Sequence, residues 1–240
     1  MNYIFHDEVI DYVFFNQHKP KTILFLHGWG GNKNSFAQTI KLLKTKFNIL
    51  TLTMPTTEQT NLSWQLTDYV ELVCNILKAL NIKELVVVCH SFGFRVATLL
   101  KYKIKISKLV VTGGAGPKKF SMLKKISANN GRILLKQNRF KNLFSSIVSK
   151  DYLTLSNTNK QTFKNVVNIN TKSLLKFDCP VLLFWGKRDY ETPLWIAKKI
   201  LKINNAKPII TGGNHFTYLH ESTIFNHNVL EFLKWFISIF

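Results

Sequence analysis

The stretch that decides the fold is Leu85-Val86-Val87-Val88-Cys89-His90-Ser91-Phe92-Gly93, an apolar run that ends at a serine and a glycine. Residues 85–89 are almost wholly apolar, which is typical of a strand buried on both faces of a parallel sheet. Residues 92–100 have the pattern of a helix. Ser91 is therefore expected on a sharp strand-to-helix turn, where small residues two positions before and after it relieve crowding. Gly93 fits this G-x-S-x-G pattern, and Cys89 replaces its first glycine.

Strand and helix patterns alternate along most of the chain, which indicates an α/β fold with a mostly parallel central sheet flanked by helices. The clearest helix is expected over residues 63–80, where apolar residues recur every three or four positions and Ser63 stands where an N-cap would. The other strands are expected at residues 22–26, 47–52, 108–112, 180–184 and 207–210. The other helices are expected at residues 35–45, 194–201 and 228–239.

A glycine-rich loop, His27-Gly28-Trp29-Gly30-Gly31, follows the first of these strands. Glycines let the backbone turn tightly and leave N–H groups facing a ligand. Donors fixed in this way are what an oxyanion hole requires, because they stabilise the negative charge that develops on a carbonyl oxygen under attack. A glycine-rich turn without a catalytic role is the alternative interpretation of this motif taken alone.

An acid and a histidine follow the last two predicted strands. Asp189 ends the string Trp185-Gly186-Lys187-Arg188-Asp189, and His215 lies in Gly212-Gly213-Asn214-His215-Phe216. A serine hydroxyl becomes a nucleophile when a histidine accepts its proton and a carboxylate orients that histidine. Loops at the carboxyl edge of a parallel sheet bring such residues together, so the order Ser91, Asp189, His215 predicts one site.

Together these motifs resemble the α/β-hydrolase superfamily over essentially the whole chain except residues 117–179. Within that superfamily, the glycine-tryptophan loop and the His90-Ser91-Phe92-Gly93 turn with Arg95 are similar to small bacterial carboxylesterases. Two residues depart from the pattern: Cys89 replaces a glycine, and Phe94 replaces a small residue after Gly93. Both are expected to narrow the pocket without removing a catalytic group.

The resemblance implies a role for each motif residue. Ser91 would be the nucleophile, His215 the base and then the acid, and Asp189 the carboxylate that orients the histidine. The backbone N–H groups of Trp29 and Phe92 would form the oxyanion hole. A metal or cofactor is not needed for this chemistry, and none is expected.

Two of these assignments have a rival in the sequence. His220 lies five residues after His215, but it lacks the preceding glycines. Glu191 lies two residues after Asp189, but only Asp189 has the Gly-x-x-Asp spacing after the strand. We therefore expect His215 and Asp189 to be the catalytic pair.

Other residues near the motifs are candidates for binding the substrate. They are His27, Gly28, His90, Phe120 and Phe144. The two histidines belong to turns, where a structural hydrogen-bonding role is the more common one. Arg95 lies one helical turn after Ser91, and hydrogen bonding to nearby loop carbonyls is favoured over anion binding.

Residues 117–179 interrupt the alternation and hold much of the excess charge. The chain has 33 Lys+Arg and 13 Asp+Glu, a net charge of +20. Residues 117–178 alone contain thirteen of the basic residues and two of the acids. We expect residues 1–116 and 180–240 to form an α/β-hydrolase core, with residues 117–179 as an inserted helical cap.

The composition also excludes several classes of protein. The basic residues are almost all lysines, which argues against nucleic-acid binding because planar bidentate recognition prefers arginine; an AT-rich coding bias explains part of the excess. Three scattered cysteines fit neither a disulfide framework nor a zinc cluster. The acidic N-terminus is unlike a signal peptide, and no apolar run approaches the length of a transmembrane span, so a cytoplasmic protein is expected.

These observations predict a serine hydrolase that cleaves a small-molecule carboxylic ester through an acyl-enzyme. The basic cap suggests an anionic substrate, or one delivered by an acidic acyl carrier protein. The oxyanion motif agrees with this, since it is similar to that of the pimeloyl-carrier-protein methyl ester esterases. Two alternatives remain: a peripheral lipase whose cap lies weakly on an anionic membrane, and a non-catalytic binding protein on the same fold.

Overall fold

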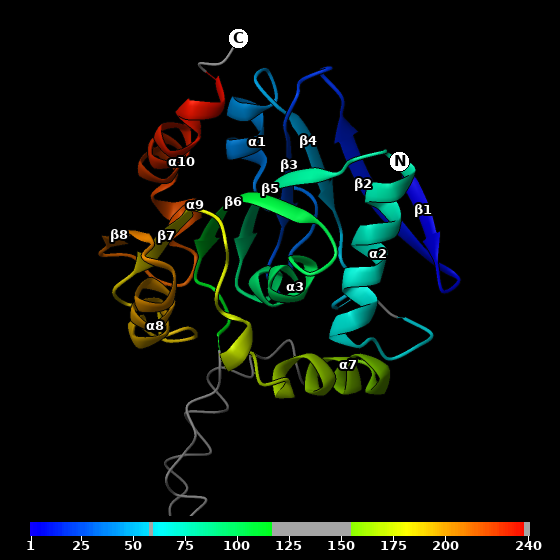
Figure 1. Ribbon diagram of the computed structural model, residues 1–240. Helices are drawn as coiled ribbons and strands as arrows, with labels where there is room; N and C mark the ends of the chain where they lie inside the picture. Colours follow the sequence, from blue (N-terminus) through cyan, green and yellow to red (C-terminus); the bar gives the residue numbers. More distant parts are fainter. Residues whose placement is uncertain (58–59, 117–154, 238–240) are drawn as a thin grey trace, which may run out of the picture.

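The apolar runs of the sequence form the centre of one eight-stranded sheet (Figure 1). A computed structural model describes residues 1–57, 60–116 and 155–237. The strand order is β1-β2-β4-β3-β5-β6-β7-β8; β2 is antiparallel to β1 and β4, and the neighbours from β4 to β8 are parallel. The strands are β1 Asn2–Phe5, β2 Glu8–Phe15, β3 Thr22–Leu26, β4 Asn48–Leu52, β5 Glu84–His90, β6 Lys105–Thr112, β7 Val181–Gly186 and β8 Lys207–Thr211. The predicted mostly parallel sheet is therefore confirmed.

Helices cover both faces of this sheet, because successive residues of each buried strand point to opposite sides. On β3, Ile23 packs with α1 and α10, whereas Leu24 belongs to the layer that contains α2, α3 and α8 (Figure 1). Both residues are fully buried. A strand buried on both faces in this way is mostly apolar along its length, as the sequences of β3 and β5 are. The helices are α1 Ala37–Leu43, α2 Leu66–Ala79, α3 Phe92–Leu100, α7 Asn157–Asn168, the short 3-10 helix η1 Lys172–Leu174, α8 Leu194–Asn204, α9 Thr217–His220 and α10 Ser222–Ile237. None of the helices in the described parts of the chain is long and apolar enough to cross a membrane.

Three local expectations differ from the structure. The first is the start of α2, which begins at Leu66 with Gln65 as its N-cap, so Ser63 is not the cap. The cause is tertiary: the main chain of Trp64, just before the cap, is held by hydrogen bonds to Thr162 (2.9 Å) and Asn165 (3.1 Å) of α7.

The other two differences lie at the ends of the chain. The hairpin of β1 and β2 is absent from the predicted elements, because exposed apolar residues such as Ile4 and Val9 blur the alternation on which the prediction depends. Helix α10 begins at Ser222, six residues before the predicted start at residue 228, because Phe225 in its first turns packs into the core.

Arg95 of α3 joins Gly116, the last residue described before position 117, to the C-terminal end of α7. Its Nη1 donates to the carbonyls of Val166 (3.2 Å) and Ile169 (3.1 Å), and Nη2 donates to that of Gly116 (2.9 Å). Burial lowers the pKa of Arg95 to about 10, so the guanidinium stays charged at neutral pH. The predicted structural role of Arg95 is confirmed. The division into a core and a cap over 117–179 stays a prediction, since residues 117–154 lie outside the described parts.

Replacing this guanidinium is expected to destabilise the protein. Arg95→Met leaves three carbonyls without their charged donor, which we expect to lower the free energy of unfolding by about 2–3 kcal/mol. Urea denaturation measures the change. The matched control is Arg188→Met, because Arg188 is exposed and its Nε makes one bond to the Gly212 carbonyl. Equal stability of the two variants would contradict the role assigned to Arg95.

Candidate active site

Ser91 occupies a strained turn between β5 and α3. Its backbone has φ +47° and ψ −111°, a conformation that residues with a Cβ rarely adopt. Hydrogen bonds hold it there: the Ser91 N–H donates to the Thr112 carbonyl (3.2 Å), and the Ser91 carbonyl accepts from the N–H groups of Phe94 (3.1 Å) and Ala115 (3.0 Å). Ser91 itself is half-buried between buried neighbours, so the turn presents the serine side chain.

The residues two positions away from Ser91 explain how the turn packs. A Cβ on Gly93 would clash with the carbonyl of Leu26 in β3, so only glycine allows this approach of α3 to the sheet. Cys89 is fully buried, and its Sγ lies 3.4 Å from the Val110 carbonyl. Burial raises the pKa of the Cys89 thiol well above its usual value, so Cys89 packs in the core as a neutral thiol.

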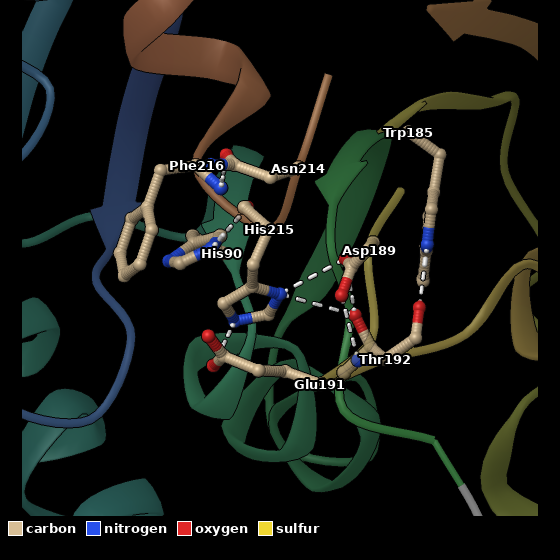
Figure 2. Close-up of polar contacts among 8 residues, drawn as sticks. All are labelled: His90, Trp185, Asp189, Glu191, Thr192, Asn214, His215 and Phe216. Atoms are coloured by element: carbon tan, nitrogen blue, oxygen red, sulfur yellow. Dashed lines mark hydrogen bonds and ion pairs between the residues drawn. The ribbon is translucent and has the colours of Figure 1, made fainter. Parts of the chain in front are cut away.

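Asp189 and His215 meet at the same edge of the sheet, from the loops after β7 and β8 (Figure 2). Nδ1 of His215 donates to Oδ2 of Asp189 over 2.9 Å, and both residues are at least 96% buried. Thr192 supports the carboxylate: its N–H donates to Oδ1 and its hydroxyl to Oδ2, each over 2.7 Å. The carboxylate thus fixes the imidazole orientation and places the proton on Nδ1, which leaves Nε2 for chemistry.

Gly113, just after β6, lies against the Asp189–His215 pair. Its φ is +52°, and a Cβ here would lie 3.0 Å from Nδ1 of His215 and 3.2 Å from Oδ2 of Asp189. The preceding residue, Thr112, accepts the hydrogen bond from Ser91. The close approach of the imidazole and the positive φ therefore both require glycine at position 113.

The two rivals from the sequence occupy different positions. His220 is exposed at the end of α9. Glu191 does not contact Nδ1 of His215; its carboxylate instead lies 3.3 Å from Nε2, on the opposite side of the ring (Figure 2). The structure thus pairs Asp189 with His215 and adds a second carboxylate that the sequence did not predict.

His90, the last residue of β5, is placed beneath His215. Its Nε2 donates to the His215 carbonyl (3.1 Å), and the two rings lie 4.6 Å apart. Burial, together with the neighbouring His215, lowers the pKa of His90 well below its usual value, so His90 is neutral at neutral pH. This position fits the structural role expected for the turn histidines, because His90 holds the main chain of His215.

The glycine-tryptophan loop lies beside the start of α3. Buried His27 supports it: Nδ1 donates to the Gly28 carbonyl (2.6 Å) and Nε2 accepts from the Met54 N–H (2.8 Å). The ring of Trp29 contacts that of Phe92 edge-on, with centroids 5.7 Å apart. The two residues predicted to form the oxyanion hole are therefore neighbours, and the N–H of Phe92 belongs to the first turn of a helix, where donors lack intrahelical partners.

The remaining candidates extend this surface or fall outside it. Phe163 of α7 packs edge-on against Trp29, with ring centroids 5.1 Å apart, which places an aromatic residue of the predicted cap beside the loop. Phe120 and Phe144 lie outside the described residues. The sequence did not indicate the roles of Thr192 and Glu191. Thr192 bonds to Asp189 within one loop whose conformation no pattern predicts, and Glu191 reaches a residue on another loop.

Known proteins share this architecture. The family model described as the alpha/beta hydrolase fold matches residues 21–145. The hydrolase YugF of Bacillus subtilis is 26% identical over 211 residues, which cover 75% of this chain and 77% of that protein.

Two solved structures have the same fold. An esterase from Exiguobacterium antarcticum superposes with a TM-score of 0.73 at 15% identity and covers 94% of this chain and 96% of its own. MGS-M2, an alpha/beta hydrolase from a deep-sea metagenome library of the Medee basin, superposes with a TM-score of 0.75 at 20% identity and covers 98% and 97%.

The family match includes more than half of the chain, from β3 through the turn at Ser91 and beyond. The strand order and the strand-to-helix turn agree with it. This protein is therefore a member of the α/β-hydrolase family of enzymes.

Proposed function

We propose that this protein is a serine hydrolase that cleaves carboxylic esters, with Ser91, His215 and Asp189 as its catalytic groups. The observation that carries the proposal is the buried 2.9 Å hydrogen bond between Asp189 and Nδ1 of His215, together with the strained turn at Ser91, the residue that follows His90. His90 itself contacts His215. Names of relatives and structural neighbours, hydrolase and esterase among them, support the same class of reaction.

The first half-reaction transfers the acyl group to Ser91. Nε2 of His215 accepts the hydroxyl proton while Oγ bonds to the carbonyl carbon, and the carbonyl oxygen takes up the electron pair. When this intermediate collapses, the bond to the alcohol oxygen breaks, and that oxygen takes the proton from Nε2. Asp189 stabilises the imidazolium that exists between these two transfers.

The second half-reaction releases the acid. Water gives a proton to Nε2 and attacks the acyl carbon, after which Oγ leaves and recovers the proton. In both half-reactions the amides of Trp29 and Phe92 would donate to the negative oxygen. A donor of this kind typically contributes about 3–4 kcal/mol of transition-state stabilisation, because it is already oriented before charge develops.

The finer part of the proposal concerns the substrate. The excess of basic residues between 117 and 178 supports an ester that is anionic, or that is carried by an acidic acyl carrier protein. A field of this sign would accelerate the approach of such a partner and would be screened by salt.

Ser91→Ala is expected to remove both the nucleophile and its covalent chemistry. A fluorophosphonate probe should label the wild type and not this variant, and kcat for a p-nitrophenyl ester should fall at least about a thousandfold. The matched control is Ser63→Ala, since Ser63 is exposed and lies before α2; it should be labelled as the wild type is. A wild type that resists labelling and hydrolyses no ester would instead indicate a non-catalytic binding protein.

Salt distinguishes the carrier-bound substrate from a neutral one. Raising ionic strength from roughly 0.01 to 0.1 M shortens the Debye length from about 30 to about 10 Å. We expect kcat/KM for an ester on an acyl carrier protein to fall severalfold over this range, because steering is lost, while the value for a neutral p-nitrophenyl ester stays constant. The same salt dependence for both esters would refute the steering role of the basic segment.

A further inference from the structure

Glu191 places a second carboxylate on the catalytic imidazole. Its Oε2 lies 3.3 Å from Nε2 of His215, while Asp189 binds Nδ1 on the other side of the ring (Figure 2). The two carboxylates differ in environment: the Asp189 side chain is 1% exposed, whereas that of Glu191 is 50% exposed. Glu191 therefore lies at the open side of the site, and the inner carboxylate is already committed to Thr192 and His215.

The backbone that carries Glu191 is fixed by the same loop. The next residue, Thr192, donates both its N–H and its hydroxyl to Asp189, and its carbonyl accepts from Nε1 of Trp185 (2.8 Å). Because residues 189 and 192 are held in this way, Glu191 is presented toward His215 from a constrained loop. The backbone position of Glu191 is therefore set by the same hydrogen bonds that hold Asp189.

The contact with Nε2 has a chemical consequence. A carboxylate only accepts hydrogen bonds, so Glu191 can bind Nε2 of His215 only when that nitrogen carries a proton. In the proposed reaction Nε2 carries that proton after Ser91 has attacked, and gives it to the alcohol oxygen of the ester. The alcohol oxygen must therefore come within hydrogen-bonding distance of the atom that Glu191 contacts, which places the carboxylate beside the leaving group.

We propose that Glu191 is a specificity-determining residue that favours esters whose alcohol part carries a positive charge. The inference rests on the ester hydrolysis proposed above and adds the chemical class of the leaving group. When the alcohol oxygen of a bound ester approaches Nε2 of His215, a positive charge on that alcohol would lie near Glu191. The cation would then be the ion-pair partner of the Glu191 carboxylate. The acyl part and the alcohol part of an ester are different groups, so this preference is compatible with an anionic or carrier-bound acyl group.

The preference for a cationic alcohol depends on charges close to His215 and not on the net charge of the chain. The titratable groups packed around His215 are Asp189, Glu191 and the neutral His90, so Glu191 is the exposed anion of the group. The chain as a whole carries a net charge of +20, which repels a cationic substrate at long range. At roughly 0.1 M salt the Debye length is about 10 Å, so distant lysines are screened more than a carboxylate in contact.

The test uses two butyrate esters of nearly the same shape. One is butyrylcholine; the other is its uncharged analogue, in which a tert-butyl group replaces the trimethylammonium group. The quantity measured is the ratio of kcat/KM for the cationic ester to that for the neutral ester. In the wild type we expect a ratio above one, and in Glu191→Gln a fall of about fivefold, which is the size of an exposed ion pair.

Two further variants give the comparison its controls. Glu71→Gln removes an exposed carboxylate from α2 and should keep the wild-type ratio, because both variants change the net charge equally. Glu191→Asp keeps the charge and should retain more of the ratio than Glu191→Gln does.

The outcomes separate the two proposals. An unchanged ratio in Glu191→Gln overturns the role of Glu191 while ester hydrolysis stands. Loss of activity toward both esters in Glu191→Gln also overturns it, since Glu191 would then act in the reaction itself. If the wild type hydrolyses neither these esters nor a p-nitrophenyl ester, the proposed function fails.

Discussion

The positive φ of Ser91 is the constraint on which the site depends. A non-glycine residue keeps this conformation only when its surroundings oppose every alternative. Strand β3 restrains the turn on one side. The first turn of α3 approaches the Leu26 carbonyl so closely that position 93 must lack a side chain. Hydrogen bonds to Thr112 and Ala115 hold the turn from the side of β6. The buried centre of the sheet thus supports the strain that exposes the serine hydroxyl.

His215 is also held by several hydrogen bonds, most of them from loop residues. Asp189 and Thr192 from the loop after β7 hold one ring nitrogen, and His90 at the end of β5 binds the backbone carbonyl of the same residue. Desolvation keeps His90 neutral, so it supports His215 without placing a second positive charge beside the imidazolium of the proposed reaction. Such prior orientation is what a proton-transfer step needs, because the geometry does not have to be reorganised during turnover.

Charge acts on two scales in this molecule. The net charge of +20 is spread over many lysines, and it influences what approaches the protein over distances that salt shortens. The Glu191 carboxylate acts over a few ångströms on the leaving-group side, where salt screens it less. The two charges have opposite signs, and in the proposed reaction they would act on different parts of the ester. The long-range positive field would act on the acyl part or its carrier, and Glu191 would act on the alcohol part.

The sequence by itself determined the alternation of strands and helices, the turn at Ser91 and the pairing of Asp189 with His215. Each of these follows from local rules: a fully buried strand is apolar throughout, a strained turn needs Gly93, and loops after parallel strands meet at one edge. Only the tertiary structure decided that α2 begins at Leu66, that Arg95 joins α7 to Gly116, and that Glu191 lies on Nε2 of His215. Those contacts join residues distant in the chain or on different loops, and their geometry depends on how whole elements pack, which periodicity and spacing do not encode.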